Sequence, residues 1–137
     1  MPWLLDTNQW IALLKRRCAP LAAKLAATPP EEVWFCSLVK EELLHGALKY
    51  GDPAARQAKL QELFDLHDSV PFDDEAAAAA ARIRHDLELG GRIIGPHDTQ
   101  IAGLALSRNW TLVTSNTDEF SRVRGLKLED WTIGDHS

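Results

Sequence analysis

One acidic residue of this chain lies where the sequence pattern calls for an apolar side chain. The segment Ile93–Asn109 has the spacing of an amphipathic helix, and on a helical wheel Asp98 falls in the middle of the apolar arc. That arc contains Ile101, Ala102, Leu104, Ala105 and Leu106, and the opposite arc, the predicted solvent face, contains Thr99, Gln100, Gly103 and Ser107. A carboxylate on a buried face needs a partner, such as a cation shared with other carboxylates. The simpler interpretation is that Asp98, just after Pro96, complements the positive end of the helix dipole.

Two further acidic positions are candidates for the same chemistry. Asp6 follows the first apolar run "WLL" directly, and the stretch "SLVKEELLHGAL" offers both Glu41 and Glu42. Glu42 lies one helical turn before Gly46, where a missing side chain leaves room for a metal, a ligand or another backbone. Glu41 shares its face with His45. The pattern favours Glu42 slightly.

Five short β-favouring runs and the helical patterns between them predict the framework that holds these residues. The runs are Trp3–Leu5, Val33–Cys36, Ser69–Phe72, Trp110–Ser115 and Leu126–Trp131. Helix starts are expected near Ser37 and Asp52, and the alanine-rich string "EAAAAAARIRHDLELGG" predicts a long helix closed by its glycines. The alternation predicts an α/β fold with a mainly parallel central sheet of about five strands flanked by helices.

Parallel sheets bind ligands at the carboxyl ends of their strands, which gives chain position a functional meaning. Asp6 ends the first strand, with Thr7 and Asn8 at the turn. The fourth run is followed by "SNTDEF", which places Asn116, Asp118 and Glu119 at a second strand end. Polar residues are therefore expected to gather at one edge of the sheet.

Length and composition indicate one ordinary domain. The chain has 137 residues, 45% hydrophobic and 26% charged, with no composition break, so residues 1–137 are expected to form a single domain. No run approaches the ~18 apolar residues of a membrane span, and no secretory signal is evident, so a cytoplasmic protein without membrane contact is expected. Cys18 and Cys36 lack metal or redox spacing. The net charge of −5 argues only weakly against nucleic-acid binding. An acidic protein can still bind phosphate through a cation held by its carboxylates and through local basic patches, here Lys15–Arg17 and Arg82–Arg84.

Five segments in order resemble the PIN-domain ribonucleases, specifically the VapC toxins of toxin–antitoxin modules. They are "LLDTN", "SLVKEELLHGA", "GPHDTQIAGLAL", "TLVTSNTDEF" and "GLKLEDW". The similarity covers nearly the whole chain, and in the middle, Asp52–Gly90, it extends to helical character alone. The resemblance implies a single PIN-like domain in which Asp6, Glu42 and Asp98 occupy the acidic metal-binding positions of the family.

The resemblance leaves the last position of the site open. The sequence carries Asn116 where many relatives have a further aspartate, so Asn116 is a candidate catalytic residue, and Asp118 or Glu119 is a possible substitute ligand, directly or through a water. Three neighbouring side chains resemble groups that orient the carboxylates by hydrogen bonds, although capping and turn chemistry explain them equally well: Thr7, Asn8 and Thr114.

The function implied by the resemblance is that of a Mg²⁺- or Mn²⁺-dependent endoribonuclease toxin. It would hydrolyse phosphodiester bonds of structured RNA, such as tRNA, with a metal-activated water. The implied partners are a small cognate antitoxin and a second copy in a homodimer and toxin–antitoxin hetero-oligomer. The apolar faces of "LVKEELLHGAL" and "RQAKLQELFDL" are expected to form the antitoxin groove.

Three alternatives remain at this stage. His97 is tempting as a base, but it is expected to face solvent on the first helical turn as a bystander or substrate contact. A catalytically weak or inactive PIN-like nucleic-acid-binding regulator is supported by Asn116 alone. A phosphatase with an aspartyl nucleophile at Asp6 is disfavoured because Asn8 stands where its second acid would be.

Overall fold

The computed structural model describes residues 2–133 and is built on one five-stranded sheet. All neighbouring strands are parallel and follow the order β3-β2-β1-β4-β5. The strands are β1 (Trp3–Leu5), β2 (Val33–Cys36), β3 (Ser69–Val70), β4 (Thr111–Val113) and β5 (Lys127–Glu129). Each lies within a run that the sequence predicted, and β1 occupies the centre, with Leu4 opposite Trp34 and Leu112. The predicted parallel α/β fold is confirmed.

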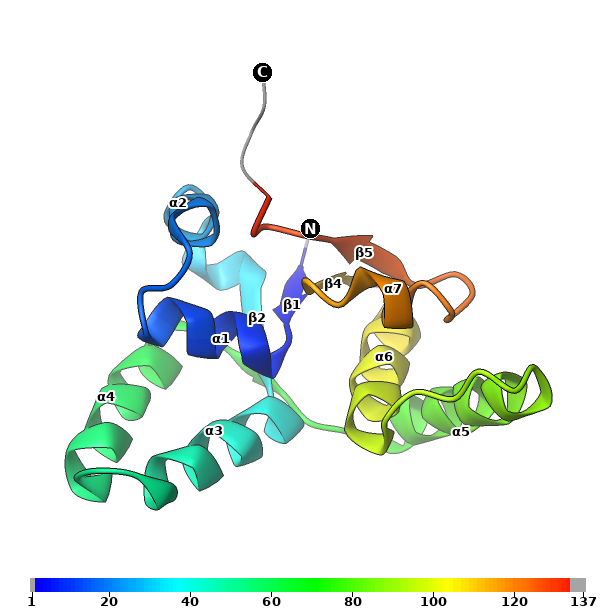
Figure 1. Cartoon of the computed structure of the whole chain (residues 1–137), viewed down its shortest axis with the longest axis horizontal. Coiled ribbons are helices and arrows are strands. Elements are labelled where there is room, and N and C mark those ends of the chain that lie inside the picture. Colours follow the sequence, from blue (N-terminus) through cyan, green and yellow to red (C-terminus); the bar gives the residue numbers. More distant parts are fainter. Residues whose placement is uncertain (1, 134–137) are drawn as a thin grey trace.

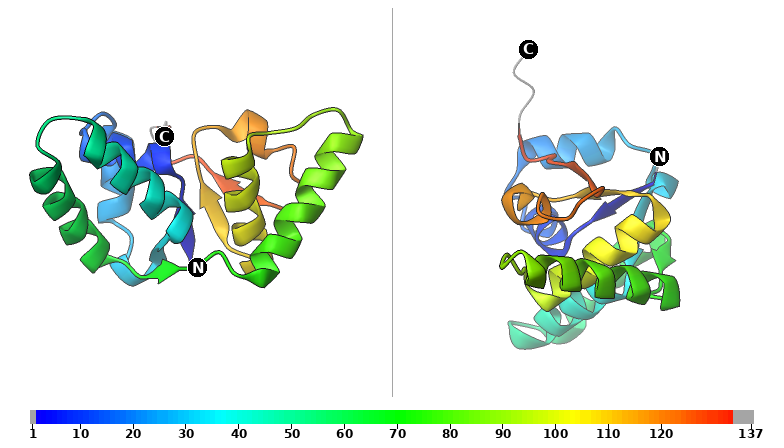
Figure 2. Two further views of the ribbon diagram at one scale, coloured as in Figure 1. Left: turned by 90° about the horizontal axis from the view of Figure 1, so that it is seen from below. Right: turned by 90° about the vertical axis from the view of Figure 1, so that its right-hand side faces the viewer.

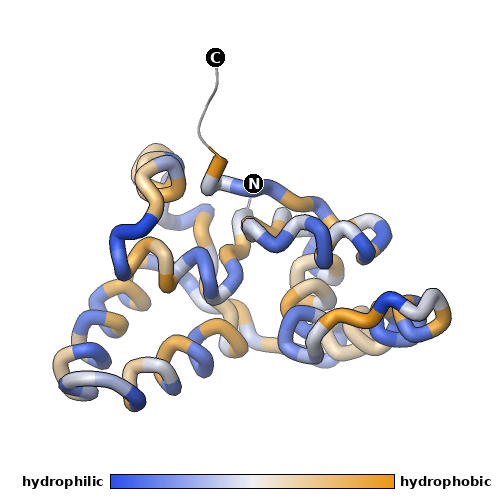
Figure 3. Tube along the Cα trace, viewed as in Figure 1, coloured by the Kyte–Doolittle hydropathy of each residue, from blue (hydrophilic) through white to orange (hydrophobic). Residues whose placement is uncertain are grey.

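Seven helices and one 3₁₀ turn connect the strands. They are α1 (Thr7–Leu14), α2 (Ala19–Ala26), η1 (Pro30–Glu32), α3 (Ser37–Lys49), α4 (Pro53–Leu66), α5 (Asp74–Leu89), α6 (Pro96–Arg108) and α7 (Thr117–Phe120) within residues 2–133. The α3–α4 and α5–α6 pairs stand on opposite sides of the strands (Figures 1 and 2). Apolar and polar segments alternate along α3 and α4, as in helices with one buried face (Figure 3). No helix of the described part of the chain is long and apolar enough to cross a bilayer.

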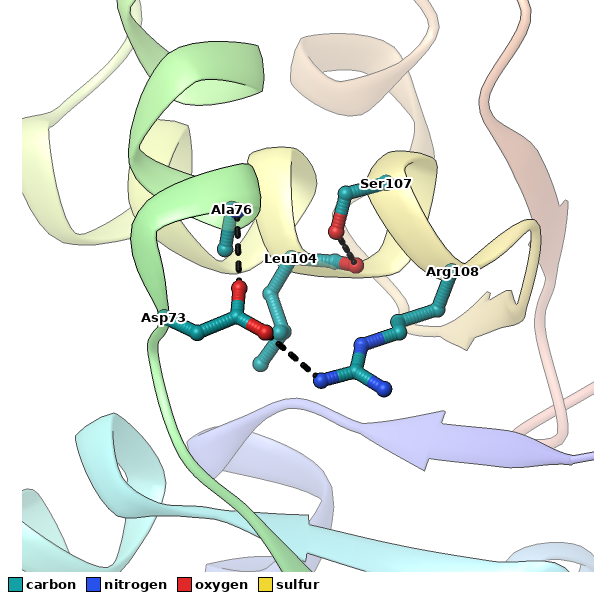
Figure 4. A network of polar contacts seen from close by, with 5 residues as sticks. All are labelled: Asp73, Ala76, Leu104, Ser107 and Arg108. Atoms are coloured by element: carbon teal, nitrogen blue, oxygen red, sulfur yellow. Dashed lines mark hydrogen bonds and ion pairs between the residues drawn. The ribbon is translucent and has the colours of Figure 1, made fainter.

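The start of α5 is fastened to the end of α6. Asp73 caps α5 by accepting a hydrogen bond from the Ala76 N–H at 2.9 Å. Its other oxygen accepts from the Arg108 guanidinium at 2.7 Å, while Ser107 donates to the Leu104 carbonyl within α6 (Figure 4). These contacts hold the two helices side by side at this end.

The prediction that one face of α6 is exposed to solvent is wrong, because α5 covers that face. Thr99 is 7% exposed, and Gly103 is buried. A Cβ built on Gly103 would lie 2.7 Å from both the Cβ and the backbone N of Ala80. The glycine therefore allows the two helix backbones to approach closely, and α6 is buried on two sides rather than one.

Candidate active site

Asp6 sits at the point where the strand order reverses. The chain runs from β1 to β2 and β3 on one side of the sheet and continues with β4 and β5 on the other. The Asp6 N–H donates to the Val113 carbonyl of β4 at 3.2 Å, which fixes Asp6 between the ends of both strands. Such a reversal in a parallel sheet is where ligands bind.

The Asp6 carboxylate is 6% exposed and held by two donors. The Gln9 N–H donates to Oδ1 at 3.2 Å, and the Thr114 hydroxyl donates to Oδ2 at 2.5 Å. Burial raises the pKa of Asp6, the hydrogen bonds from Thr114 and Gln9 oppose the rise, and the negative charges of Asp98 and Glu42 add to it. The site therefore concentrates negative charge where water is scarce.

Three carboxylates from different parts of the chain line one cleft of about 220 Å³. Asp6 comes from the β1–α1 junction, Glu42 from α3 and Asp98 from the first turn of α6. The other residues that line the cleft are Thr7, Asn8, Gly95, Pro96, His97 and Ile101. The structure thus places the three predicted acidic positions on one cleft.

The choice between the two adjacent glutamates is clear from their surroundings. Glu42 lines the cleft, whereas Glu41 lines a separate outer groove with His45. Gly46, the residue that favoured Glu42 in the sequence, does not line this cleft. A Cβ on Gly46 would meet nothing within 4 Å, so no part of the described chain approaches it closely.

Asp98 is half-buried and faces a further acid from α7. Burial raises the pKa of Asp98, the charge of Glu119 raises it further, His97 lowers it, and Glu42 makes a smaller contribution that raises it. Asn116 holds this acid, because its side-chain amide donates to Glu119 Oε2 at 2.6 Å. Of the two acids considered as substitutes for Asn116, Glu119 is therefore the one that lies beside the cleft.

His97 does not face open solvent as predicted. Its Nε2 lies 2.5 Å from Glu42 Oε1, with the side chains 31% and 41% exposed. The expectation that side chains of a first helical turn face solvent failed here, because His97 of α6 lies against Glu42 of α3. His97 thus connects α6 with α3.

Of the three residues expected to orient the carboxylates, one does so by direct contact. Thr114 donates to Asp6, and its hydroxyl also accepts from the Asn116 N–H at 3.0 Å. The Thr7 hydroxyl is buried without a hydrogen-bond partner among residues 2–133, and Asn8 is exposed at the rim. Gln9, which contacts Asp6, was missed because a glutamine in a first helical turn carries no distinguishing signal in one sequence.

The oxygen atoms of the cleft meet part of what a hard divalent cation such as Mg²⁺ requires. Among the described residues, no three Asp, Glu, His or Cys side chains are close enough together to hold one ion, and Glu42 instead contacts His97. Mg²⁺, however, commonly uses one or two carboxylates and keeps several waters. The oxygens of Asp6 and Asp98, together with the unpartnered Thr7 hydroxyl, fit that demand.

Comparisons with known proteins identify the family. The PIN domain model matches residues 3–126. The tRNA(fMet)-specific endonuclease VapC of Shigella flexneri is 35% identical over 132 residues, covering 96% of this chain and 99% of that protein. The DNA-bound VapBC structure from Salmonella typhimurium is 30% identical, with a TM-score of 0.89 and coverage of 96% and 98%. The VapBC2 structure from Rickettsia felis, bound to a fragment of promoter DNA, is also 30% identical, with a TM-score of 0.88 and coverage of 96% and 99%. This chain therefore belongs to the PIN-domain family and, within it, to the VapC proteins.

Proposed function

We propose that this protein is a Mg²⁺- or Mn²⁺-dependent endoribonuclease that acts as the toxin of a toxin–antitoxin module. The observation that carries the proposal is the cleft that Asp6, Glu42 and Asp98 line together. Burial, with a smaller contribution from neighbouring acids, raises the pKa values of both aspartates, as expected where carboxylates converge in a partly enclosed cleft. Relatives named as ribonucleases or endonucleases support the same activity.

The residues of the cleft have separable tasks in this proposal. Asp6 and Asp98 would hold the ion, and Glu42 would join them after leaving His97. When bound, the ion activates water and neutralises charge on the scissile phosphate. Thr114 keeps the Asp6 carboxylate oriented. His97 binds Glu42 and has no role as a general base.

Asn116 is assigned to holding Glu119 rather than to binding the ion. Its amide donates to the Glu119 carboxylate, so an acid remains on this side of the cleft although the chain lacks an aspartate at position 116. This arrangement supports the nuclease over an inactive nucleic-acid-binding regulator, for which Asn116 was the only argument.

The proposed substrate is structured RNA, such as a tRNA, in the cytoplasm. The name of the Shigella relative specifies tRNA(fMet), and we extend to this chain only the class of molecule. RNA of this kind is recognised largely through its shape and backbone, which residues outside the acidic cleft must read.

An antitoxin is proposed to bind the outer groove of α3. This groove has a volume of about 500 Å³ and is lined by Ser37, Lys40, Glu41, Leu44, His45 and Leu48. Leu48 is 58% exposed, although it is a large apolar residue. Three of the solved relatives are VapBC complexes, which supports a toxin–antitoxin hetero-oligomer. We propose that a homodimer of this chain forms its toxin part. Expression of this chain alone is expected to stop bacterial growth, and co-expression of the cognate antitoxin to restore it.

Cleavage of total RNA by the purified protein tests the nuclease. Fragments are expected with Mn²⁺ and not with chelator, and Asp98→Asn is expected to remove nearly all of them. Glu42→Gln and Glu41→Gln form a matched pair, since the residues are adjacent but line different hollows. A severe loss is expected from Glu42→Gln and a mild one from Glu41→Gln. The reverse result, or cleavage that ignores chelator, would refute the proposal.

A further inference from the structure

Gln9 is a buried polar residue that the proposed mechanism leaves without a task. It lies on the first turn of α1 and is 2% exposed, although its side chain is an amide. Its N–H donates to Asp6 Oδ1 at 3.2 Å. Its side-chain Nε2 donates to Ser115 Oγ, also at 3.2 Å, across 106 positions of sequence. Gln9 therefore ties the segment after β1 to the segment after β4.

The contacts of Gln9 close a ring of hydrogen bonds around the Asp6 carboxylate. Thr114 donates its hydroxyl to Asp6 Oδ2, opposite the oxygen that accepts from Gln9. Ser115, the next residue, completes the ring by accepting from the Gln9 amide. The ring extends to Asn116, whose N–H donates to the Thr114 hydroxyl. The end of β4 is thus fixed relative to Asp6 from two sides.

Packing alone does not explain an amide at this position. The Gln9 Oε1 is buried and has no hydrogen-bond partner among residues 2–133. A buried carbonyl without a partner lowers stability, so an unbranched apolar side chain such as methionine would fill this space at a smaller cost. The polar contact that remains for the side chain is its bond to Ser115.

We infer that Gln9 is a positioning residue for the acidic cleft, acting through its bond to Ser115. That bond fixes the segment after β4, which carries the Thr114 hydroxyl bound to Asp6 and leads into the acidic helix α7. The inference rests on the proposed metal-dependent function and extends it to a residue outside the cleft. Hydrogen bonds to metal-binding groups typically change metal affinity by about 10–100-fold.

Titration calorimetry with Mn²⁺ on the full chain tests the inference. Gln9→Met and Ser115→Ala are each expected to weaken Mn²⁺ binding by about tenfold or more. The double variant is expected to be no weaker than Gln9→Met alone, because both changes remove the same bond. The kcat for RNA cleavage falls with little change in KM. Gln9→Met keeps the melting temperature of the metal-free parent, since the unpartnered carbonyl is lost with the amide.

Controls separate positioning from a general loss of structure. Gln61→Met is the matched change, because Gln61 on α4 also donates to a side chain, Asp65, at 2.8 Å, but on the exposed surface. It is expected to bind Mn²⁺ as the parent does. Ser115 is exposed, so Ser115→Ala tests the bond even if Gln9→Met does not fold.

Three results would overturn the inference. In the first, Gln9→Met and Ser115→Ala bind Mn²⁺ as tightly as the parent, while Asp98→Asn binds it more weakly. The proposed function would then hold, and Gln9 would have no part in it. Additive losses in the double variant would show that the two residues act independently. A parent that binds no Mn²⁺ would remove both the proposed function and this inference.

Discussion

The close approach of α5 and α6 at Gly103 allows a quantitative prediction for a single added methyl group. In Gly103→Ala the new Cβ would lie 2.7 Å from the Cβ and N of Ala80 and 2.8 Å from its Cα. Carbon atoms in contact prefer roughly 3.5–4.0 Å, so the helices must separate by about 1 Å. The obstacle is helix backbone, which cannot rotate away as the end of a side chain can.

The two opposing contributions to the stability of Gly103→Ala can be compared. Overpacking of a well-packed core costs about 1–3 kcal/mol, and contact with backbone belongs at the upper end. Replacing a mid-helix glycine by alanine returns about 1 kcal/mol. The net expectation is a loss of about 2 kcal/mol, equivalent to a fall in melting temperature of roughly 5–10 °C for a domain of this size.

Gly46→Ala is the matched control for this prediction. Gly46 is also inside a helix, but a Cβ there meets nothing within 4 Å, so only the gain in helix propensity applies. Its free energy of unfolding is expected to rise by about 0.5–1 kcal/mol. Urea denaturation of the parent and both variants measures the difference. A Gly103→Ala protein as stable as the parent would show that α5 and α6 do not pack as described.

Three further predictions concern charged residues. Glu119→Gln is expected to reduce RNA cleavage about tenfold or more, because Glu119 lies beside Asp98. Asp118→Asn is expected to leave cleavage nearly unchanged, and equal effects of the two variants in the cleavage assay would contradict this prediction. The Ala76 N–H and the Arg108 guanidinium lower the pKa of Asp73 below 3.8, so its stabilising effect is complete above about pH 5 and is lost as the pH falls through the folded-state pKa. Between about pH 5 and about pH 3, the melting temperature of Asp73→Asn should therefore fall by less than that of the parent. Burial and Glu119 raise the pKa of Asp98, so without metal the parent should gain stability as the pH falls through that raised pKa towards 3.8, and thermal melts of Asp98→Asn should show a smaller gain.

The framework of the molecule was predictable because local patterns determine it. Short β-favouring runs such as Val33–Cys36 recur between helical patterns, and such alternation has few solutions other than a parallel sheet. Asp6 could be placed because a residue directly after the first strand must lie at the carboxyl edge of the sheet. The order of the strands and the covering of α6 by α5 were not predictable, because they depend on contacts between distant segments.

The candidate site was predictable in its acids and not in its supporting contacts. Asp98 stood out because its position on the helical wheel conflicts with its charge. Gln9 and the contact of His97 with Glu42 have no such signature, since each depends on residues brought together by the tertiary fold. The solvent face assigned to α6 failed for the same reason: a wheel shows which residues share a side, and not which helix covers it.

The central position of β1 also determines when the acidic cleft can form during synthesis. Asp6 receives one of its two side-chain hydrogen bonds from Thr114, which lies 108 positions later in the chain. A ribosome that adds about 5–20 residues per second reaches that position only after roughly 5–20 s. Until then Asp6 lacks both its neighbouring strand β4 and its hydroxyl donor. A nascent chain that stops short of Thr114 therefore cannot form the supported Asp6 carboxylate, and a cell that makes this protein meets the complete site only after that position has been translated.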